Sequence, residues 1–184
     1  MASNVTDLLH AWHDFYLLVG TASATLVGLM FIAASIGAQI FKEENRGAME
    51  AFISPTVVHF STTLFVSIFA TVPVHSGLPL TALFVVIGLA GFAFSARVWV
   101  QLLIRRSFRV DVIDRLFYAL IPCGGHLLVP IAGVTLIMHP ELGLDCLAAA
   151  SLILLFAGIR NAWDMTMWIV IKIPVGESRI EPPT

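Results

Sequence analysis

The stretch FYLLVGTASATLVGLMFIAASIGAQIF, residues 15–41, decides the fold class of this chain. It contains 27 residues and no charged side chain. At 1.5 Å per residue an α-helix of that length is about 40 Å long, which is enough to cross roughly 30 Å of bilayer hydrocarbon with some tilt. We therefore expect residues 15–41 to form a transmembrane helix.

Four more apolar stretches follow, separated by turns rich in Pro, Gly or charged residues. Ser54-Pro55 is typical of a helix N-cap followed by proline at the first helical position, so we expect the second helix to begin there. The sequence predicts an all-α polytopic membrane protein, a helix bundle with five transmembrane helices at residues 15–41, 55–72, 79–104, 116–138 and 144–173. Residues 1–174 form a single transmembrane domain in this interpretation, and residues 175–184 form a flexible cytosolic tail.

Composition favours the same fold class. The 184 residues are 58% hydrophobic and 12% charged, with a mean hydropathy of +0.92, whereas soluble domains carry roughly 25% charged residues. One soluble core of this size could not bury so much apolar surface. The net charge is −2, and no basic face is large enough to neutralise several phosphates, so we expect no nucleic-acid partner.

The distribution of basic residues predicts an orientation. All ten Lys and Arg residues fall on one side of the proposed membrane: Lys42, Arg46, Arg97, Arg105, Arg106, Arg109, Arg115, Arg160, Lys172 and Arg179. The positive-inside rule then places the N-terminus outside and the C-terminus inside, in a plasma membrane of the bacterial inner-membrane type. Residues 1–15 contain no Lys or Arg, so they lack the basic region of a signal peptide, and we expect the first helix to be retained.

Small residues recur every four positions along the first helix, at Gly20, Ala24 and Gly28. Helices associate in lipid largely through close backbone approach, which small residues permit. The stripe predicts either packing within the chain or a subunit interface. Because five helices enclose little interior, we also expect a homo-oligomer.

Several polar side chains lie within the inner halves of the predicted helices, where ionisable groups are costly and mark functional-site hypotheses. This predicted polar cluster comprises His59, Arg97, His126, Arg160, Asn161 and Asp164. Arg160 and Asp164 are four residues apart, so they share a helix face and can pair. In one interpretation the arginines extend to the cytosolic headgroups and Asp164 neutralises one of them. In the other, the cluster forms a polar vestibule that meets an ion, a small anion or a proton.

The second predicted helix is the most polar one. His59, Thr63, Ser67 and Thr71 recur every four residues and stay broadly on one side of the helix. Hydroxyls in membrane helices also bond to the preceding backbone carbonyls, which would make them neutral packing elements. We keep both interpretations, pore lining by Thr63, Ser67 and Thr71 and simple helix packing.

The fourth predicted helix contains Pro122-Cys123-Gly124-Gly125-His126, followed by Pro130. Proline removes a backbone donor and glycine loosens a helix, so we expect a kink. The kink serves either packing alone or a gate or binding notch at His126.

Metal and haem sites have weak support in the sequence. His10, His13 and Asp14 fall at helical spacing if the N-terminal segment is helical, which would suit zinc or copper. His59 and His126 on different helices would suit haem. No HExxH or CxxC pattern supports the metal site, and we expect no cofactor.

The leading functional hypothesis is a homo-oligomeric channel or permeation module for an ion or small solute. The alternatives are a non-catalytic scaffold or accessory subunit of a larger complex, and a haem- or metal-binding electron-transfer subunit. The sequence contains neither a Gly-x-Ser-x-Gly nucleophile motif nor a phosphate-binding glycine loop, so an enzyme is the less favoured class.

Overall fold

The computed structural model describes residues 5–40, 46–72, 77–104 and 120–172. Within these residues the chain forms five α-helices and no strand, which confirms the all-α prediction. The helices are α1 (Val5–Ile40), α2 (Arg46–Thr71), α3 (Gly77–Ile104), α5 (Ile121–Met138) and α6 (Pro140–Lys172).

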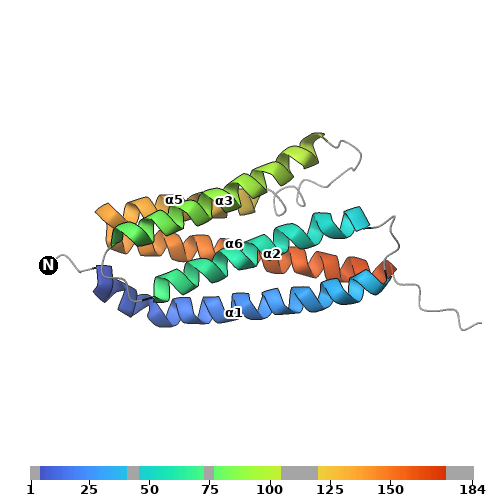
Figure 1. The fold of residues 1–184 in the computed structure, drawn as a ribbon, viewed down its shortest axis with the longest axis horizontal. Helices are drawn as coiled ribbons and strands as arrows, with labels where there is room; N and C mark the ends of the chain where they lie inside the picture. The colour runs from blue at the N-terminus through green and yellow to red at the C-terminus, as the bar shows by residue number, and fades with distance from the viewer. Residues whose placement is uncertain (1–4, 41–45, 73–76, 105–119, 173–184) are drawn as a thin grey trace, which may run out of the picture.

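The five helices pack side by side into one elongated bundle with alternating directions (Figure 1). Helices α2 and α6 contact each other and occupy the middle of the bundle. Helix α1 packs against both of them, while α3 and α5 pair with each other and cover the opposite side. Because α1 has only two substantial neighbours, much of its surface faces away from the bundle.

Four of the described helices are long and apolar enough to cross a membrane, over Asp7–Ile36, Leu78–Val100, Ile121–Met138 and Pro140–Met167. Helix α2 is not apolar enough to count as a fifth such helix, because its Ser, Thr and His side chains lower its mean hydropathy. The five-span prediction is therefore not confirmed: four of the described helices are long and apolar enough to span a membrane, and α2 is not. Helix α2 nevertheless packs lengthwise between α1, α3 and α6.

Three predicted helix starts are wrong, those of α1, α2 and α6. Helix α1 begins at Val5 rather than at residue 15, because Leu8, Leu9 and Trp12 follow helical spacing and pack on the main apolar core. Helix α2 begins at Arg46, so Pro55 lies inside the helix and Ser54 is not its N-cap. A single proline costs the helix one backbone hydrogen bond, and the packing of the bundle offsets that loss.

The turn between α5 and α6 is shorter than the gap between the predicted helices, which end at residue 138 and begin at residue 144. Helix α5 ends at Met138 and α6 begins at Pro140, so only His139 separates them. The backbone N–H of His139 donates to the Thr135 carbonyl (2.8 Å), and that of Gly143 donates to the His139 carbonyl (2.9 Å). Proline suits the first helical position because its missing N–H would have no partner there.

Several predictions fall on residues outside the described ranges. They concern the start of the fourth predicted helix at residues 116–119, the basic segment at residues 105–115 and the tail at residues 175–184.

The basic residues within the described helices gather toward one end of the bundle. Arg46 begins α2 and Lys172 ends α6, while Arg97 and Arg160 lie in the second halves of α3 and α6. We call this end, where α1, α3 and α6 finish and α2 begins, the basic end (right in Figure 1). No described Lys or Arg lies in the opposite half of the bundle.

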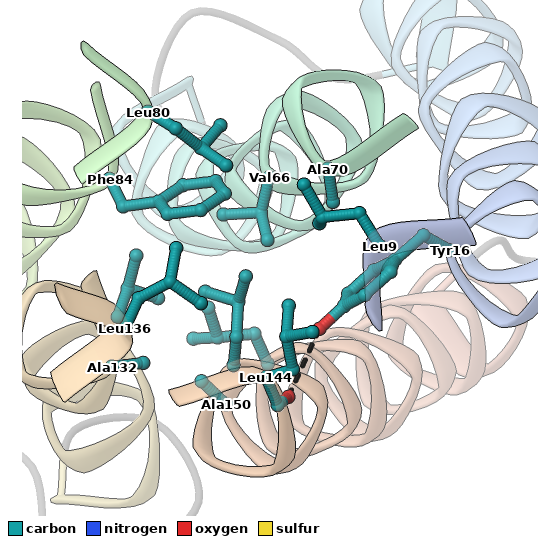
Figure 2. Close-up of a cluster of buried hydrophobic side chains, with 13 residues drawn as sticks. Leu9, Tyr16, Val66, Ala70, Leu80, Phe84, Ala132, Leu136, Leu144 and Ala150 are labelled. Carbon is teal, nitrogen blue, oxygen red and sulfur yellow. Dashed lines mark hydrogen bonds between the residues drawn. The ribbon is translucent and has the colours of Figure 1, made fainter. Parts of the chain in front are cut away.

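The main apolar core fills the half of the bundle away from the basic end (Figure 2). It includes Leu9, Val66, Leu80, Phe84, Leu136 and Leu144, all nearly or completely buried. Tyr16 is fully buried among them, and its hydroxyl donates to the backbone carbonyl of Leu144 at 3.1 Å. A second, smaller core around Met30, Phe60 and Met165 lies nearer the basic end. Apolar side chains therefore fill the interior of the bundle in the half away from the basic end.

Candidate functional site

Two histidines from different helices meet inside the bundle. His59 Nδ1 of α2 lies 3.1 Å from His126 Nε2 of α5, and both side chains are almost completely buried. The ring centroids are 5.3 Å apart and the ring planes are inclined by 48°. One of the two facing nitrogens must carry the proton and the other must accept it. This pair is the centre of the candidate site.

Helix α3 makes room for the pair by presenting glycines to α5. A Cβ atom on Gly91 would overlap Nδ1 of His126, and one on Gly88 would overlap Pro130. Any side chain at position 91 would therefore push the imidazole away from His59. Pro130 also cannot donate a backbone hydrogen bond to the carbonyl of His126 four residues earlier.

Several buried polar atoms, on the histidine pair and on the neighbouring helices α3 and α6, have no partner among the described residues. His59 Nε2, His126 Nδ1, Ser95 Oγ and both side-chain polar atoms of Asn161 make no hydrogen bond with a described residue. Ser95 lies one turn beyond Gly91 on α3. Asn161 lies one turn beyond Gly158 on α6, where a Cβ atom would meet the ring of Phe60. We call His59, Ser95, His126 and Asn161 the polar layer.

The polar layer is costly for a bundle in lipid. An unsatisfied buried polar group costs about 1–3 kcal/mol, and native proteins leave few of them. The unpartnered nitrogens of the histidine pair and the amide of Asn161 are therefore expected to bind water.

The charged residues of the predicted cluster lie at the periphery of the bundle. Arg160 and Asp164 form an ion pair along α6, as their spacing predicted, and both side chains are about one-third exposed. Arg97 is exposed on α3 and makes no ion pair with a described residue. Of the six residues predicted to cluster, the structure joins His59 to His126 and Arg160 to Asp164. Asn161 is buried without a side-chain hydrogen bond to a described residue, and Arg97 is exposed.

The three α2 hydroxyls predicted to line a pore lie in different environments. Thr63 is buried and donates to the backbone carbonyl of His59 at 3.1 Å. Ser67 is buried, and its hydroxyl has no partner among the described residues. Thr71 is partly exposed and donates to the carbonyl of Ile68 at 2.9 Å. Hydrogen bonds to backbone carbonyls of α2 thus satisfy the hydroxyls of Thr63 and Thr71 but not that of Ser67.

The small-residue stripe of α1 is used for packing at one position only. A Cβ atom on Gly20 would lie 2.9 Å from Cβ of Ser67, so α1 and α2 approach closely there. Ala24 and Gly28 are exposed, and a Cβ on Gly28 would have no atom within 4 Å.

The structure gives little support to a metal centre. His10, His13 and Asp14 lie in α1, which confirms that this segment is helical, and His13 Nδ1 is 3.2 Å from Asp14 Oδ1 on the surface. No group of three His, Cys, Asp or Glu residues able to hold a metal occurs in the described part of the chain. His59 and His126 are within hydrogen-bond distance of each other, so they leave no room for a porphyrin between them.

Two members of the site escaped prediction as functional residues. Gly91 and Ser95 look like ordinary small packing residues in the sequence, because their role depends on which helix they face. The four-residue spacing that places them on one face of α3 was the available signal.

The fold and the site together define an all-helical bundle whose apolar helices suit an integral membrane protein and whose interior holds a polar layer. No protein-family model, no curated protein and no solved structure matches the chain.

Proposed function

We propose that this chain is an integral membrane permeation module that carries protons, with His59 and His126 as the relay. The observation that supports it best is the buried hydrogen bond between the two imidazoles, whose remaining nitrogens are unpartnered. Imidazole both accepts and releases a proton at physiological pH, which makes it the usual side chain for proton relay. Intramembrane ionisable groups commonly mark proton or ion pathways.

The geometry of the pair suits a transfer in three movements. With His59 donating its Nδ1 proton to His126 Nε2, an incoming proton binds His59 Nε2. The shared proton then crosses to His126 Nε2, and His126 releases the proton from its Nδ1. One proton enters and one leaves, and both rings end neutral in the opposite tautomer. The rings must then exchange tautomers before the next transfer in the same direction.

On the basic-end side, Ser95 continues the path. His126 Nδ1 lies against Gly91, and Ser95 follows one turn later on α3, toward the basic end. Asn161 offers further donors and acceptors from α6 at a similar depth. Water bridging these groups would connect the pair to the aqueous phase at that end.

Toward the other end, the hydroxyls of α2 continue the path. Thr63 and Ser67 follow His59 at intervals of one turn, about 6 Å along the helix axis. Bridging water is again required at this spacing. Ser67 also lines the groove between α1 and α2.

We place the protein as a homo-oligomer in the inner (plasma) membrane, with its N-terminus outside and the basic end in the cytosol. The gathering of Arg46, Arg97, Arg160 and Lys172 at one end supports this orientation through the positive-inside rule.

A second candidate function is that of a non-catalytic membrane subunit that packs on another protein. The observation in its favour is the exposure of α1, of whose apolar window only 22% is buried, against 50% for α6. Copurification of one stoichiometric foreign chain from native membranes would favour this role.

Proton flux into liposomes tests the proposal. The purified protein is reconstituted into vesicles that contain a pH-sensitive dye and high potassium, and valinomycin then sets an inside-negative voltage. We expect the lumen to acidify at least tenfold faster than in empty vesicles, with no matching flux of potassium or chloride in parallel assays. Rates equal to those of empty vesicles, at several pH values and voltages, would contradict the proposal. Selective potassium or chloride flux would retain a channel but remove the proton as its cargo.

A further inference from the structure

Ser23 lies at the centre of the face that α1 turns toward the rest of the bundle. Its side chain is completely buried, between the buried side chains of Tyr16 and Met30 on the same face of the helix. Its hydroxyl has no hydrogen-bond partner among the described residues. The position is close to the middle of the apolar stretch Asp7–Ile36, so it lies far from the headgroups on either side of a membrane. Ser23 is therefore an unsatisfied polar group deep inside the bundle.

Other hydroxyls of α1 are satisfied by their own helix. Thr21, Thr25 and Ser35 each donate to the backbone carbonyl four residues earlier, at 2.8, 2.9 and 2.8 Å. These three side chains are exposed, and a hydroxyl that faces lipid has its own backbone as the available acceptor. Ser23 does not use the acceptor that its own helix offers. Its hydrogen-bond partner is therefore expected in the interior of the bundle.

Helix α6 places a second serine opposite Ser23. Helices α1 and α6 both run toward the basic end, and the Tyr16 hydroxyl donates to the Leu144 carbonyl (Figure 2). Ser23 follows Tyr16, and Ser151 follows Leu144, by two helical turns on the same face. One further interval along α1, Met30 again packs with residues of α6, so the register is kept. Ser151 is buried as well, and the two serines therefore lie at the same depth where α1 meets α6.

Helix α2 adds two more hydroxyls at this depth. A Cβ atom on Gly20 would lie 2.9 Å from Cβ of Ser67, and α1 and α2 run in opposite directions. Ser23 is therefore at about the level of Thr63, with Ser67 one turn away. Thr63 and Ser67 are buried, and Thr63 donates to the backbone carbonyl of His59. We call Ser23, Thr63, Ser67 and Ser151 the hydroxyl junction.

The hydroxyl junction has the donors and acceptors that a bound water needs. The hydroxyls of Ser23 and Ser67 have no partner in the described part of the chain. Those of Thr63 and Ser151 donate to their own helices, at 3.1 and 2.9 Å, and their oxygens can still accept a bond. Buried water bridges groups of this kind. The four side chains of the junction are neutral, so they offer a desolvated ion no counter-charge, and water is the ligand that fits them.

We propose that the hydroxyl junction binds water and that this water forms the arm of the proton path that leads away from the basic end. The second part rests on the proposed function, whereas the binding of water does not. A path along α2 requires bridging water at Thr63 and Ser67, and Ser23 and Ser151 supply partners for that water from α1 and α6. Helix α1 then contributes to the path through its buried face.

The reactivity of engineered cysteines with Ag⁺ tests the hydration, because this ion is close to water in size and reaches thiols through water. In the full-length protein in membranes, the two native cysteines are first replaced (Cys123→Ala and Cys146→Ala), and Ser23→Cys or Ser151→Cys is then introduced. Ala150→Cys is the matched control, since Ala150 is completely buried beside Ser151 but belongs to the main apolar core. After denaturation, a maleimide counts the thiols that Ag⁺ has not blocked. We expect Ag⁺ to block Ser23→Cys and Ser151→Cys at least tenfold faster than Ala150→Cys. Equal rates at positions 23 and 150 would overturn the proposal.

Proton flux tests the part that the junction plays in the path. In the liposome assay, Ser23→Ala should lower voltage-driven proton flux at least fivefold, while Ser35→Ala, on an exposed serine of the same helix, should match wild type. Unchanged flux in Ser23→Ala would remove the junction from the path even if its cysteines react. A wild type that carries no protons, together with a Ser23→Cys that reacts with Ag⁺, would contradict the relay and support the hydrated junction.

Discussion

His59 Nδ1 and His126 Nε2 lie 3.1 Å apart inside the bundle, on residues separated by 67 positions in the chain. The contact requires α2 and α5 to be held at one register, and α3 sets that register by fitting Gly91 against the His126 ring. The close packing of α3 on α5 therefore helps to hold a polar contact between α2 and α5 that contributes little to apolar burial.

The closeness of Gly91 to the imidazole gives a direct test of the packing. Gly91→Ala should lower the free energy of unfolding by about 1–3 kcal/mol, since the added methyl group overlaps the His126 ring. The measurement is the apparent Tm of the detergent-solubilised protein. Gly124→Ala is the control, because a Cβ there meets nothing within 4 Å, and alanine favours a helix over glycine. A Gly91→Ala variant as stable as Gly124→Ala would show that α3 and the histidine ring are farther apart.

The hydroxyl of Tyr16 ties α1 to the first turns of α6. Tyr16→Phe removes its bond to the Leu144 carbonyl and should cost about 0.5–1.5 kcal/mol, which a small drop in apparent Tm would report. Thr135→Val is the comparison, because that hydroxyl bonds only within its own helix, to Ile131 at 2.8 Å. If the two variants lose equal stability, the hydrogen bond between α1 and α6 contributes nothing specific.

The Arg160–Asp164 ion pair of α6 should contribute to the stability of the folded protein, because it is partly buried. Asp164→Asn deprives the Arg160 guanidinium of this carboxylate, at a cost between that of a surface pair and the roughly 3–5 kcal/mol of a fully buried one. We expect a lower apparent Tm, partly restored by the double variant Arg160→Gln/Asp164→Asn. The exposed Asp145→Asn serves as control and should be neutral. A double variant less stable than Asp164→Asn would argue that the arginine acts through other contacts.

The orientation of the bundle predicts which cysteines an external reagent can reach. On the background without native cysteines, His139→Cys lies between α5 and α6, at the end opposite the basic end. In intact cells, a membrane-impermeant maleimide should label His139→Cys and should label Arg179→Cys only after permeabilisation. Labelling of Arg179→Cys in intact cells, with labelling of His139→Cys only after permeabilisation, would show that the protein has the opposite orientation.

The sequence was a good guide to the fold because long uncharged stretches are a strong signal. It misplaced the start of α1 because Leu9 and Trp12 are buried by tertiary contacts that hydropathy does not register. It also treated Pro55 as a helix start, although the packing around α2 tolerates proline inside the helix.

The candidate site was only partly predictable for a similar reason. His59 and His126 are each conspicuous in an apolar helix, and the i, i+4 spacing was sufficient for the Arg160–Asp164 pair. The contact between the histidines depends on how α2, α3 and α5 cross, which periodicity does not determine. Arg97 was expected beside them, but a long side chain near a helix end can extend outward instead.

The most direct test of the central claim is the proton flux of histidine variants in liposomes. His59→Gln and His126→Gln keep a polar side chain and remove the titratable ring, so each should reduce voltage-driven proton flux at least tenfold while the protein stays folded. His139→Gln, at the far end of the bundle, should match wild type. Flux that persists unchanged in both His59→Gln and His126→Gln would contradict a relay through this pair.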